Sequence, residues 1–329
     1  MNFDIDERTI LRVKHGSMAY GTNIPGSDLD VKGVAIEPMT HMVGFLHTFE
    51  QFEQMGKAKG SNLHKSRAMA GTDVDMVIYS LRKFANLAAD ANPNIIEVLH
   101  VDETDVLFQD EFGERLRAMR DDFLSKKARY TFAGYAHAQL KRIKTHRDWL
   151  LNPPGEAPTR AKFGLSETSK ISASELGAYV SADNQNFDLS TMPREVLTLF
   201  TREKQYHGEL QRWHQYQNWV KQRNPARAEL EAKYGYDTKH GMHLIRLMRM
   251  CKEILTEGKV YVKRHDVDDL RRIRAGWWDY DRLIEESERL EAECAELYAT
   301  SPLPREPNRV KIDADIVQLT LDYFKLKGT

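Results

Sequence analysis

The sequence has few cysteines, no long apolar run and no excess of charge of either sign. Its 329 residues include two cysteines, Cys251 and Cys294, each within a helix-like pattern. This argues against a disulfide scaffold or a cysteine zinc site and predicts a reducing, cytoplasmic compartment. The 48 basic and 49 acidic residues give a net charge of −1, so no global field indicates a nucleic acid or a membrane as partner. No apolar run approaches the length of a membrane span.

The most informative stretch of the chain is residues 15–34. It follows a short apolar run, residues 10–13, that predicts a buried strand. A Gly-Ser pair comes next, then a predicted loop rich in glycine, proline, asparagine and serine. A second strand is predicted from Leu29 to Ile36. This order places a polar loop between two neighbouring strands.

Two carboxylates mark the start of the second predicted strand. Asp28 and Asp30 are two residues apart, so their side chains leave the same face of a strand. Such carboxylates repel and raise each other's pKa, and a hard cation such as Mg²⁺ removes that cost. Gly16 allows the backbone to approach a ligand closely, and Ser17 offers a hydroxyl and an N–H to a phosphate oxygen. The stretch predicts a metal-dependent site for a phosphorylated substrate.

The spacing of these residues is similar to a known signature. Gly-Ser, ten residues and Asp-x-Asp resemble the pattern of the DNA polymerase beta-type nucleotidyltransferase superfamily. The fuller strings at residues 19–22 and 27–34 resemble its RNA-repair-associated branch, which is carried by phages and bacteria. The resemblance implies an α+β fold with a minimal polymerase-beta-like α/β domain followed by a mostly helical domain. It also implies two Mg²⁺ ions, with Mn²⁺ as a possible substitute.

The resemblance implies a third metal-binding carboxylate on a neighbouring strand. Residues 74–79 predict that strand, and Asp75 is the expected third ligand beside Asp28 and Asp30. A carboxylate within a β-rich run is unfavourable unless something such as a metal requires it. Asp73 would share the same strand face and stays open as the alternative. Glu97 could point at the site, although an ordinary helix-start carboxylate is the favoured interpretation.

A second motif spans residues 234–247. Asp237 is expected to cap a helix that begins at Thr238, on which Lys239, His243 and Arg246 share one face. Potentially cationic groups near a helix N-terminus form an anion site. By resemblance, Lys239 and Arg246 bind the triphosphate, and His243 binds phosphate or substrate. The expected nucleotide-binding residues are therefore Gly16, Ser17, Tyr20, Ser27, Lys239, His243 and Arg246.

The region between residues 115 and 147 is basic. It holds ten Lys/Arg against two aspartates, with Tyr130, Phe132 and Tyr135 among them. Basic residues interleaved with aromatics suit a nucleic-acid backbone and its bases. A solvated helix face with core aromatics explains the pattern equally well. Contact with nucleic acid therefore stays open.

These observations predict a nucleotidyltransferase with two domains. Residues 1–108 form the expected catalytic domain, and residues 109–329 the helical domain that contributes triphosphate and acceptor contacts. The predicted reaction moves a nucleoside monophosphate from a nucleoside triphosphate to a hydroxyl, with an RNA 3′ end, such as that of a tRNA, as the favoured acceptor. The alternatives are a protein or small-molecule acceptor, or a non-catalytic nucleotide- or RNA-binding module. The sequence does not indicate which nucleotide is used, nor the oligomeric state.

Overall fold

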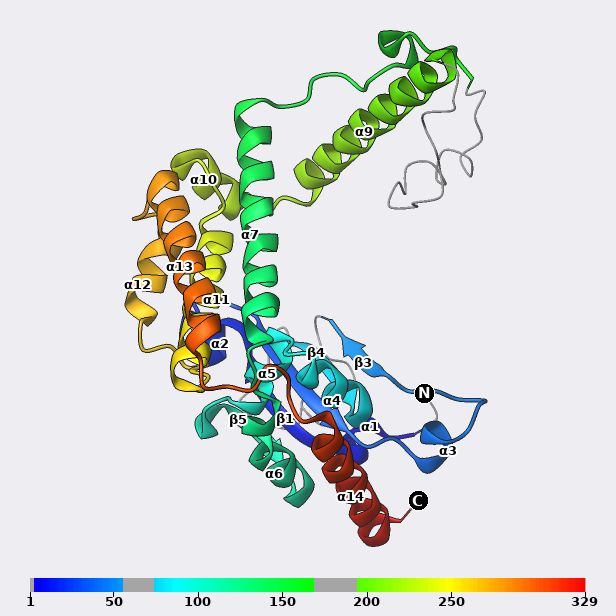
Figure 1. The fold of residues 1–329 in the computed structure, drawn as a ribbon, viewed down its shortest axis with the longest axis vertical. Helices are drawn as coiled ribbons and strands as arrows, with labels where there is room; N and C mark the ends of the chain where they lie inside the picture. The colour runs from blue at the N-terminus through cyan, green and yellow to red at the C-terminus, as the bar shows by residue number, and fades with distance from the viewer. Residues whose placement is uncertain (1–2, 56–73, 169–193, 329) are drawn as a thin grey trace. The chain divides into compact units, whose positions relative to one another are not determined.

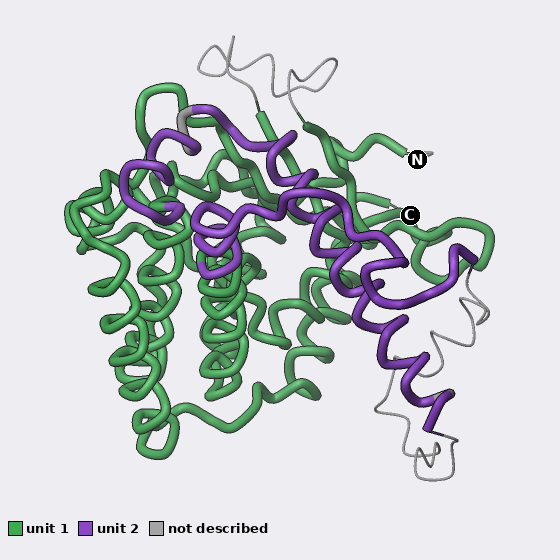
Figure 2. Tube along the Cα trace, turned by 90° about the horizontal axis from the view of Figure 1, so that it is seen from above, with its two compact units in different colours: residues 1–143, 238–329 green, residues 144–237 purple. Residues whose placement is uncertain are grey.

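The computed structural model describes residues 3–55, 74–168 and 194–328 (Figure 1). The chain forms two compact units (Figure 2). Unit 1 contains residues 1–143 and 238–329, and unit 2 contains residues 144–237. These bounds differ from the functional division at residues 108 and 109, which stays a prediction.

A five-stranded sheet forms the core of unit 1. Its spatial order is β3-β4-β2-β1-β5, with β2 and β4 parallel and the other neighbours antiparallel. The three strands predicted from the sequence are confirmed, and two short edge strands were not predicted. The strands are β1 (Thr9–His15), β2 (Leu29–Ala35), β3 (Gln51–Gln54), β4 (Val74–Ser80) and β5 (Val106–Gln109).

The two faces of this sheet differ in chemistry because side chains alternate along each strand. Leu29 and Val31 of β2 join Val74 and Met76 of β4 in one hydrophobic cluster. The residues between them point to the opposite face, and in these two strands they include Asp30, Lys32 and Asp75. One face thus stabilises the domain, and the other presents charged groups.

Helices make up most of unit 1, which confirms the expected α+β class. Ser80 caps α4, because its side chain accepts a hydrogen bond from the Lys83 N–H. None of the described helices is both long and apolar enough to cross a membrane. The helices are α1 (Ile5–Arg8), α2 (Gly16–Tyr20), α3 (Met39–Met42), α4 (Leu81–Ala89), α5 (Pro93–Leu99), α6 (Glu111–Ala118), the first part of α7 (Ala128–Leu151), α11 (Thr238–Glu257), α12 (Val267–Arg274), α13 (Tyr280–Thr300) and α14 (Arg309–Lys327).

The cysteines lie where α11 packs on α13. Both side chains are fully buried, and neither forms a disulfide. The Cys294 thiol donates to the carbonyl oxygen of Met248 at 3.7 Å, one turn before Cys251 on α11. Both cysteines therefore serve as small packing residues between helices, as their helix-like patterns predicted.

Unit 2 is helical in the part that the structure describes. It contains the end of α7, α9 (Arg194–Gln222) and α10 (Pro225–Tyr234). Trp149 of α7 packs against Tyr216 and Trp219 of α9, with ring centroids 5.9 and 5.4 Å away. These aromatic residues of α9 therefore pack between helices.

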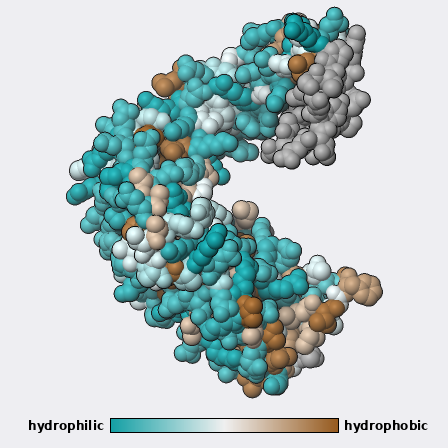
Figure 3. Space-filling view, in the orientation of Figure 1, coloured by the Kyte–Doolittle hydropathy of each residue, from teal (hydrophilic) through white to brown (hydrophobic). Residues whose placement is uncertain are grey.

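Apolar side chains also reach the surface of unit 1. Figure 3 shows them at the edge of the sheet, over the region of α3 and β3. Val43, Phe45 and Leu46 in the loop between these elements are strongly exposed.

Gly33 in β2 is expected to be essential for sheet packing. A Cβ at this position would lie 2.7 Å from the carbonyl oxygen of Leu11 on β1, closer than real Cβ atoms come. We expect Gly33→Ala to reduce the free energy of unfolding by about 1–3 kcal/mol, measured by urea denaturation.

Gly134 in α7 provides a matched control, because a Cβ there meets nothing within 4 Å. We expect Gly134→Ala to stabilise the protein by about 0.5–1 kcal/mol through helix propensity. Equal unfolding free energies for the two alanine variants would contradict the packing argument.

Candidate active site

Three polar residues form a row across the sheet. Asp30 of β2 is the register partner of Asp75 on the parallel strand β4. His15 of β1 is the register partner of Asp30 on the other side. Register partners on neighbouring strands point to the same face, so the two carboxylates and the imidazole lie side by side. The predicted choice of Asp75 agrees with this placement, whereas the alternative, Asp73, lies outside the described residues.

The row borders a cavity of about 270 Å³ in unit 1. Strands form its floor, α2 and the start of α5 form walls, and the first turns of α11 contribute cationic and imidazole groups. Five of the expected nucleotide-binding residues and two of the three expected metal ligands line it. The lining residues are His15, Gly16, Ser17, Tyr20, Asp30, Val31, Lys32, Asp75, Val77, Asn94, Lys239 and His243.

The electrostatics of the cavity centre on Asp30. Burial raises the pKa of Asp30, and the negative charge of Asp75 raises it further. Lys239 and Lys32 act in the opposite direction. Asp28 is exposed just before β2 and outside the lining, yet its charge also contributes to the raised pKa of Asp30. The carboxylates therefore repel one another, as the sequence predicted.

Gly16 is required by the close approach of Asp30. Its φ is +65°, and a Cβ at this position would lie 2.1 Å from the Asp30 Oδ2. Gly16 also begins α2, a one-turn helix where the sequence predicted a loop. Ser17 follows on this helix, and its hydroxyl bonds to none of the residues that the structure describes. The Gly-Ser pair thus borders the carboxylates directly.

Lys32 is a site residue that sequence reasoning missed. It follows Asp30 by two residues in β2 and lies on the same face, inside the cavity. Burial lowers the pKa of Lys32 to about 8, although the charges of Glu97 and Asp30 partly offset this effect. The signal for Lys32 in the sequence was a lysine within a predicted strand, where lysine is uncommon.

A fully buried carboxylate lies behind the cavity. Glu97 of α5 accepts a hydrogen bond from the Tyr20 hydroxyl at 2.6 Å and another from Arg246 Nη1. The Nε2 of His15 lies 3.1 Å from Glu97 Oε2, the same oxygen that accepts from Tyr20. Burial raises the pKa of Glu97, but the charge of Arg246 and the contact with His15 outweigh it and hold the pKa far below its usual range. Glu97 is therefore a central buried anion and not an ordinary helix-start carboxylate.

Arg246 and Ser27 are placed differently from the other expected nucleotide-binding residues. Neither lines the cavity. The buried guanidinium of Arg246 pairs with Glu97 and stacks 3.8 Å from the ring centroid of Tyr20. The Ser27 hydroxyl accepts a hydrogen bond from the Ile24 N–H at 3.0 Å and closes a turn. Their assigned roles in nucleotide binding stay predictions.

Lys239 and His243 project from the first turns of α11 into the cavity. Burial lowers the pKa of His243 far below its usual value, and the charges of Arg246 and Lys239 lower it further. The imidazole is therefore neutral near neutral pH, and its edge faces Tyr20 with centroids 6.5 Å apart. Lys239 is the charged group that this helix brings to the cavity.

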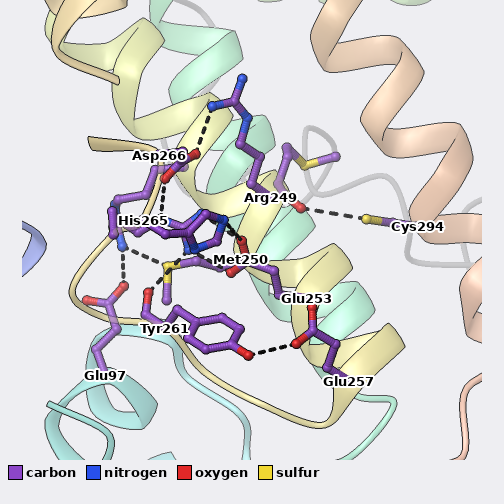
Figure 4. Close-up of polar contacts among 12 residues, drawn as sticks. Glu97, Arg249, Met250, Glu253, Glu257, Tyr261, His265, Asp266 and Cys294 are labelled. Carbon is purple, nitrogen blue, oxygen red and sulfur yellow. Dashed lines mark hydrogen bonds and ion pairs between the residues drawn. The ribbon is translucent and has the colours of Figure 1, made fainter. Parts of the chain in front are cut away.

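A second network of ion pairs holds α11 to the segment that follows it (Figure 4). Arg249 binds Asp266 and Asp269, each at 2.7 Å. The fully buried guanidinium of Arg264 binds both oxygens of Glu253 and one oxygen of Asp266. These pairs fix the path of residues 258–269 along α11.

Comparison with known proteins agrees with this geometry. Residues 3–151 match the model of RlaP, the RNA repair pathway DNA polymerase beta family. The resemblance recognised in the sequence is thus confirmed for residues 3–151. The matched segment contains the strands with Asp30 and Asp75, the Gly-Ser helix and Glu97. The family match indicates a polymerase-beta-like nucleotidyltransferase region within residues 3–151.

Two individual proteins also show similarity. The uncharacterized 38.9 kDa protein in the nrdC-mobD intergenic region of Enterobacteria phage T4 is 31% identical over 94 residues, which is 28% of this chain and 26% of the phage protein. The crystal structure of a nucleotidyltransferase-like protein from Exiguobacterium sibiricum 255-15 is 10% identical. It aligns over 98% of this chain and 86% of its own, with a TM-score of 0.24, which is too low to carry an argument.

We expect Asp30→Asn to stabilise the protein without metal ions near neutral pH. A raised pKa means that the folded state binds the proton more tightly than the unfolded state, so wild-type stability falls as pH rises through that pKa. Asparagine does not titrate, so the variant does not lose stability in this way as pH rises. Thermal unfolding in EDTA should therefore give the variant the higher Tm near neutral pH, and the difference should shrink in acid.

Added Mg²⁺ should give the wild type the higher Tm, because Mg²⁺ binding stabilises the wild type much more than the Asp30→Asn variant. A variant that is less stable than the wild type at both pH values in EDTA would contradict the proposed repulsion.

Proposed function

We propose that this protein transfers a nucleoside monophosphate from a nucleoside triphosphate to an acceptor hydroxyl in a metal-dependent reaction. One observation carries the proposal: Asp30 and Asp75 are register partners on parallel strands and border the same cavity as Ser17 and Lys239. Paired carboxylates next to a serine hydroxyl and a lysine suit a metal-bound triphosphate.

The residues of the cavity fit a divalent cation. Asp30 and Asp75 supply hard oxygen ligands, and the mutual repulsion that raises the pKa of Asp30 is what a cation relieves. Asp28, exposed at the start of β2, would complete the set. Mg²⁺ bound by these carboxylates would lower the pKa of the acceptor hydroxyl and neutralise charge on the triphosphate.

The chain's other residues would position the triphosphate. Lys239 would pair with its phosphate oxygens, and the free hydroxyl of Ser17 would donate a hydrogen bond to one of them. Gly16 lets α2 approach the carboxylates closely. Arg246, held by Glu97, would support Tyr20 in the cavity wall.

The proposed reaction is an in-line displacement at the α-phosphorus. The acceptor oxygen forms a new bond to this phosphorus while the bond to the bridging oxygen of the β-phosphate breaks, and pyrophosphate leaves. The acceptor gives up its hydroxyl proton. Asp30, Asp75 and Lys239 stay unchanged and act through position and charge.

RNA is the favoured acceptor, supported by the family description and by exposed cations on α7. Lys141, Arg142 and Lys144 are exposed there and pair with none of the described residues. Other cations of the 115–147 region are neutralised, since Arg115 pairs with Asp322 and Lys127 with Asp90. The second candidate is a protein or small-molecule acceptor, and the observation in its favour is that these cations are already neutralised.

The reaction is tested with triphosphates labelled at the α- or γ-phosphate, incubated with Mg²⁺ and total RNA. We expect only the α-label to enter an acceptor. Asp30→Asn and Asp75→Asn should each lower the rate about 1000-fold, because several kcal/mol of transition-state stabilisation are lost. Glu53→Gln on the exposed edge of β3 is the control. Transfer of the γ-label, or full activity in both aspartate variants, would contradict the proposal.

Binding of RNA is tested by a salt series on a variant with alanine at Lys141, Arg142 and Lys144. If these residues contact a single-stranded backbone, the log–log slope should flatten by about 0.7 for each lost contact. Triphosphate affinity should stay unchanged. Lys127→Ala is the control, because Asp90 already neutralises this lysine. An unchanged slope would shift the acceptor from RNA to a protein or small molecule.

A further inference from the structure

We infer that Arg274 is a positioning residue that joins the two elements expected to hold the triphosphate, α2 and the start of α11. The inference rests on the proposed function and concerns a residue 35 positions after Lys239 in the chain. Arg274 does not line the cavity, so it would act through the elements that it connects.

The first connection is to the turn after α2. Three consecutive carbonyl oxygens at this helix end accept hydrogen bonds from the 264–274 segment. Tyr20 accepts from the Arg264 N–H at 3.2 Å, Gly21 from Arg271 Nη2 at 2.7 Å and Thr22 from Arg274 Nη1 at 2.8 Å. Carbonyl groups at a helix end need such partners, and here arginine side chains supply two of the three and the backbone N–H of Arg264 supplies the third.

The second connection is to α11. The carbonyl oxygen of Arg274 accepts a hydrogen bond from the Thr238 hydroxyl at 2.8 Å. Thr238 is the first residue of α11, next to Lys239, and both Thr22 and Thr238 are almost completely buried. Arg274 therefore bonds to α2's turn with its side chain and to α11's start with its backbone.

This double connection determines how the phosphate-binding groups face each other. Ser17 lies one turn before the α2 end, and Lys239 lies one residue after Thr238. A triphosphate held by both groups requires a constant separation between the two helices. Small displacements of Ser17 or Lys239 weaken triphosphate binding, because both charge-assisted hydrogen bonds depend on the separation of the two helices.

Arg271 and Arg272 show what distinguishes Arg274. Arg271 also bonds to the turn, but it is exposed, so water can replace its contact. Arg272 is exposed and stacks on Trp277 at 5.6 Å from the ring centroid. Arg272→Ala thus removes an arginine from the same helix without touching either connection.

The experiment measures the dissociation constants of inorganic triphosphate and of each ribonucleoside triphosphate, with Mg²⁺, by equilibrium dialysis. The variants are Arg274→Ala, Arg274→Lys, Thr238→Val and the double variant Arg274→Ala/Thr238→Val, with Arg272→Ala as control. We expect Arg274→Ala and Thr238→Val each to weaken binding about tenfold. The double variant should be about as weak as the weaker single variant, because both changes break one bridge.

Arg274→Lys should recover part of the affinity, since lysine can still donate to the Thr22 carbonyl. Transfer kinetics should show the loss in KM for the triphosphate more than in kcat. A purely structural role would instead lower Tm in every variant while leaving the dissociation constants alike. Wild-type affinity in Arg274→Ala would overturn the inference and leave the proposed function intact. A wild-type protein that binds no triphosphate would overturn both.

Discussion

The buried charge of Glu97 is the constraint on which the arrangement of unit 1 depends. A carboxylate without solvent needs partners, and Glu97 draws them from three elements: His15 at the end of β1, Tyr20 of α2 and Arg246 of α11. Removing one partner of a buried pair typically costs about 3–5 kcal/mol. The pair of Arg246 and Glu97 therefore holds α11 against α5 and helps to position the residues at the start of α11.

The charged groups around the cavity have two roles: some stabilise the fold, and others face the space where a ligand would bind. Behind the cavity, Arg246 balances Glu97, whereas the imidazoles of His15 and His243 line the cavity and have pKa values lowered by burial and nearby cations. Inside the cavity, the carboxylates of Asp30 and Asp75 are register partners, and the negative charge of Asp75 raises the pKa of Asp30. This repulsion is unfavourable for folding, and a divalent cation bound with a triphosphate would relieve it.

Local patterns predicted the parts of the site that depend on neighbouring residues. The two-residue period of strands predicted which face of β2 carries Asp30. The apolar run that follows Asp75 identified β4. The capping residue of α4 and the start of α11 also followed from local signals. These features need only the chain within a few residues, so sequence analysis can find them.

Features that depend on distant partners could not be predicted in this way. The pairing of Arg246 with Glu97 could not be predicted, because the two residues lie 149 positions apart in the chain. Lys32 was missed because only the assembled sheet shows that its strand face lines the cavity. The bonds from Arg271 and Arg274 to the α2 turn join residues about 250 positions apart in the chain, so they became visible only in three dimensions.

The most direct test of the account is a crystal structure with Mn²⁺ and a non-hydrolysable triphosphate analogue, in which anomalous scattering locates the ions. The account predicts Mn²⁺ within about 2.2 Å of carboxylate oxygens of both Asp30 and Asp75. It also predicts the triphosphate oxygens beside Ser17 and Lys239. Ordered Mn²⁺ and analogue bound elsewhere, with these carboxylates free of metal, would contradict the central claim.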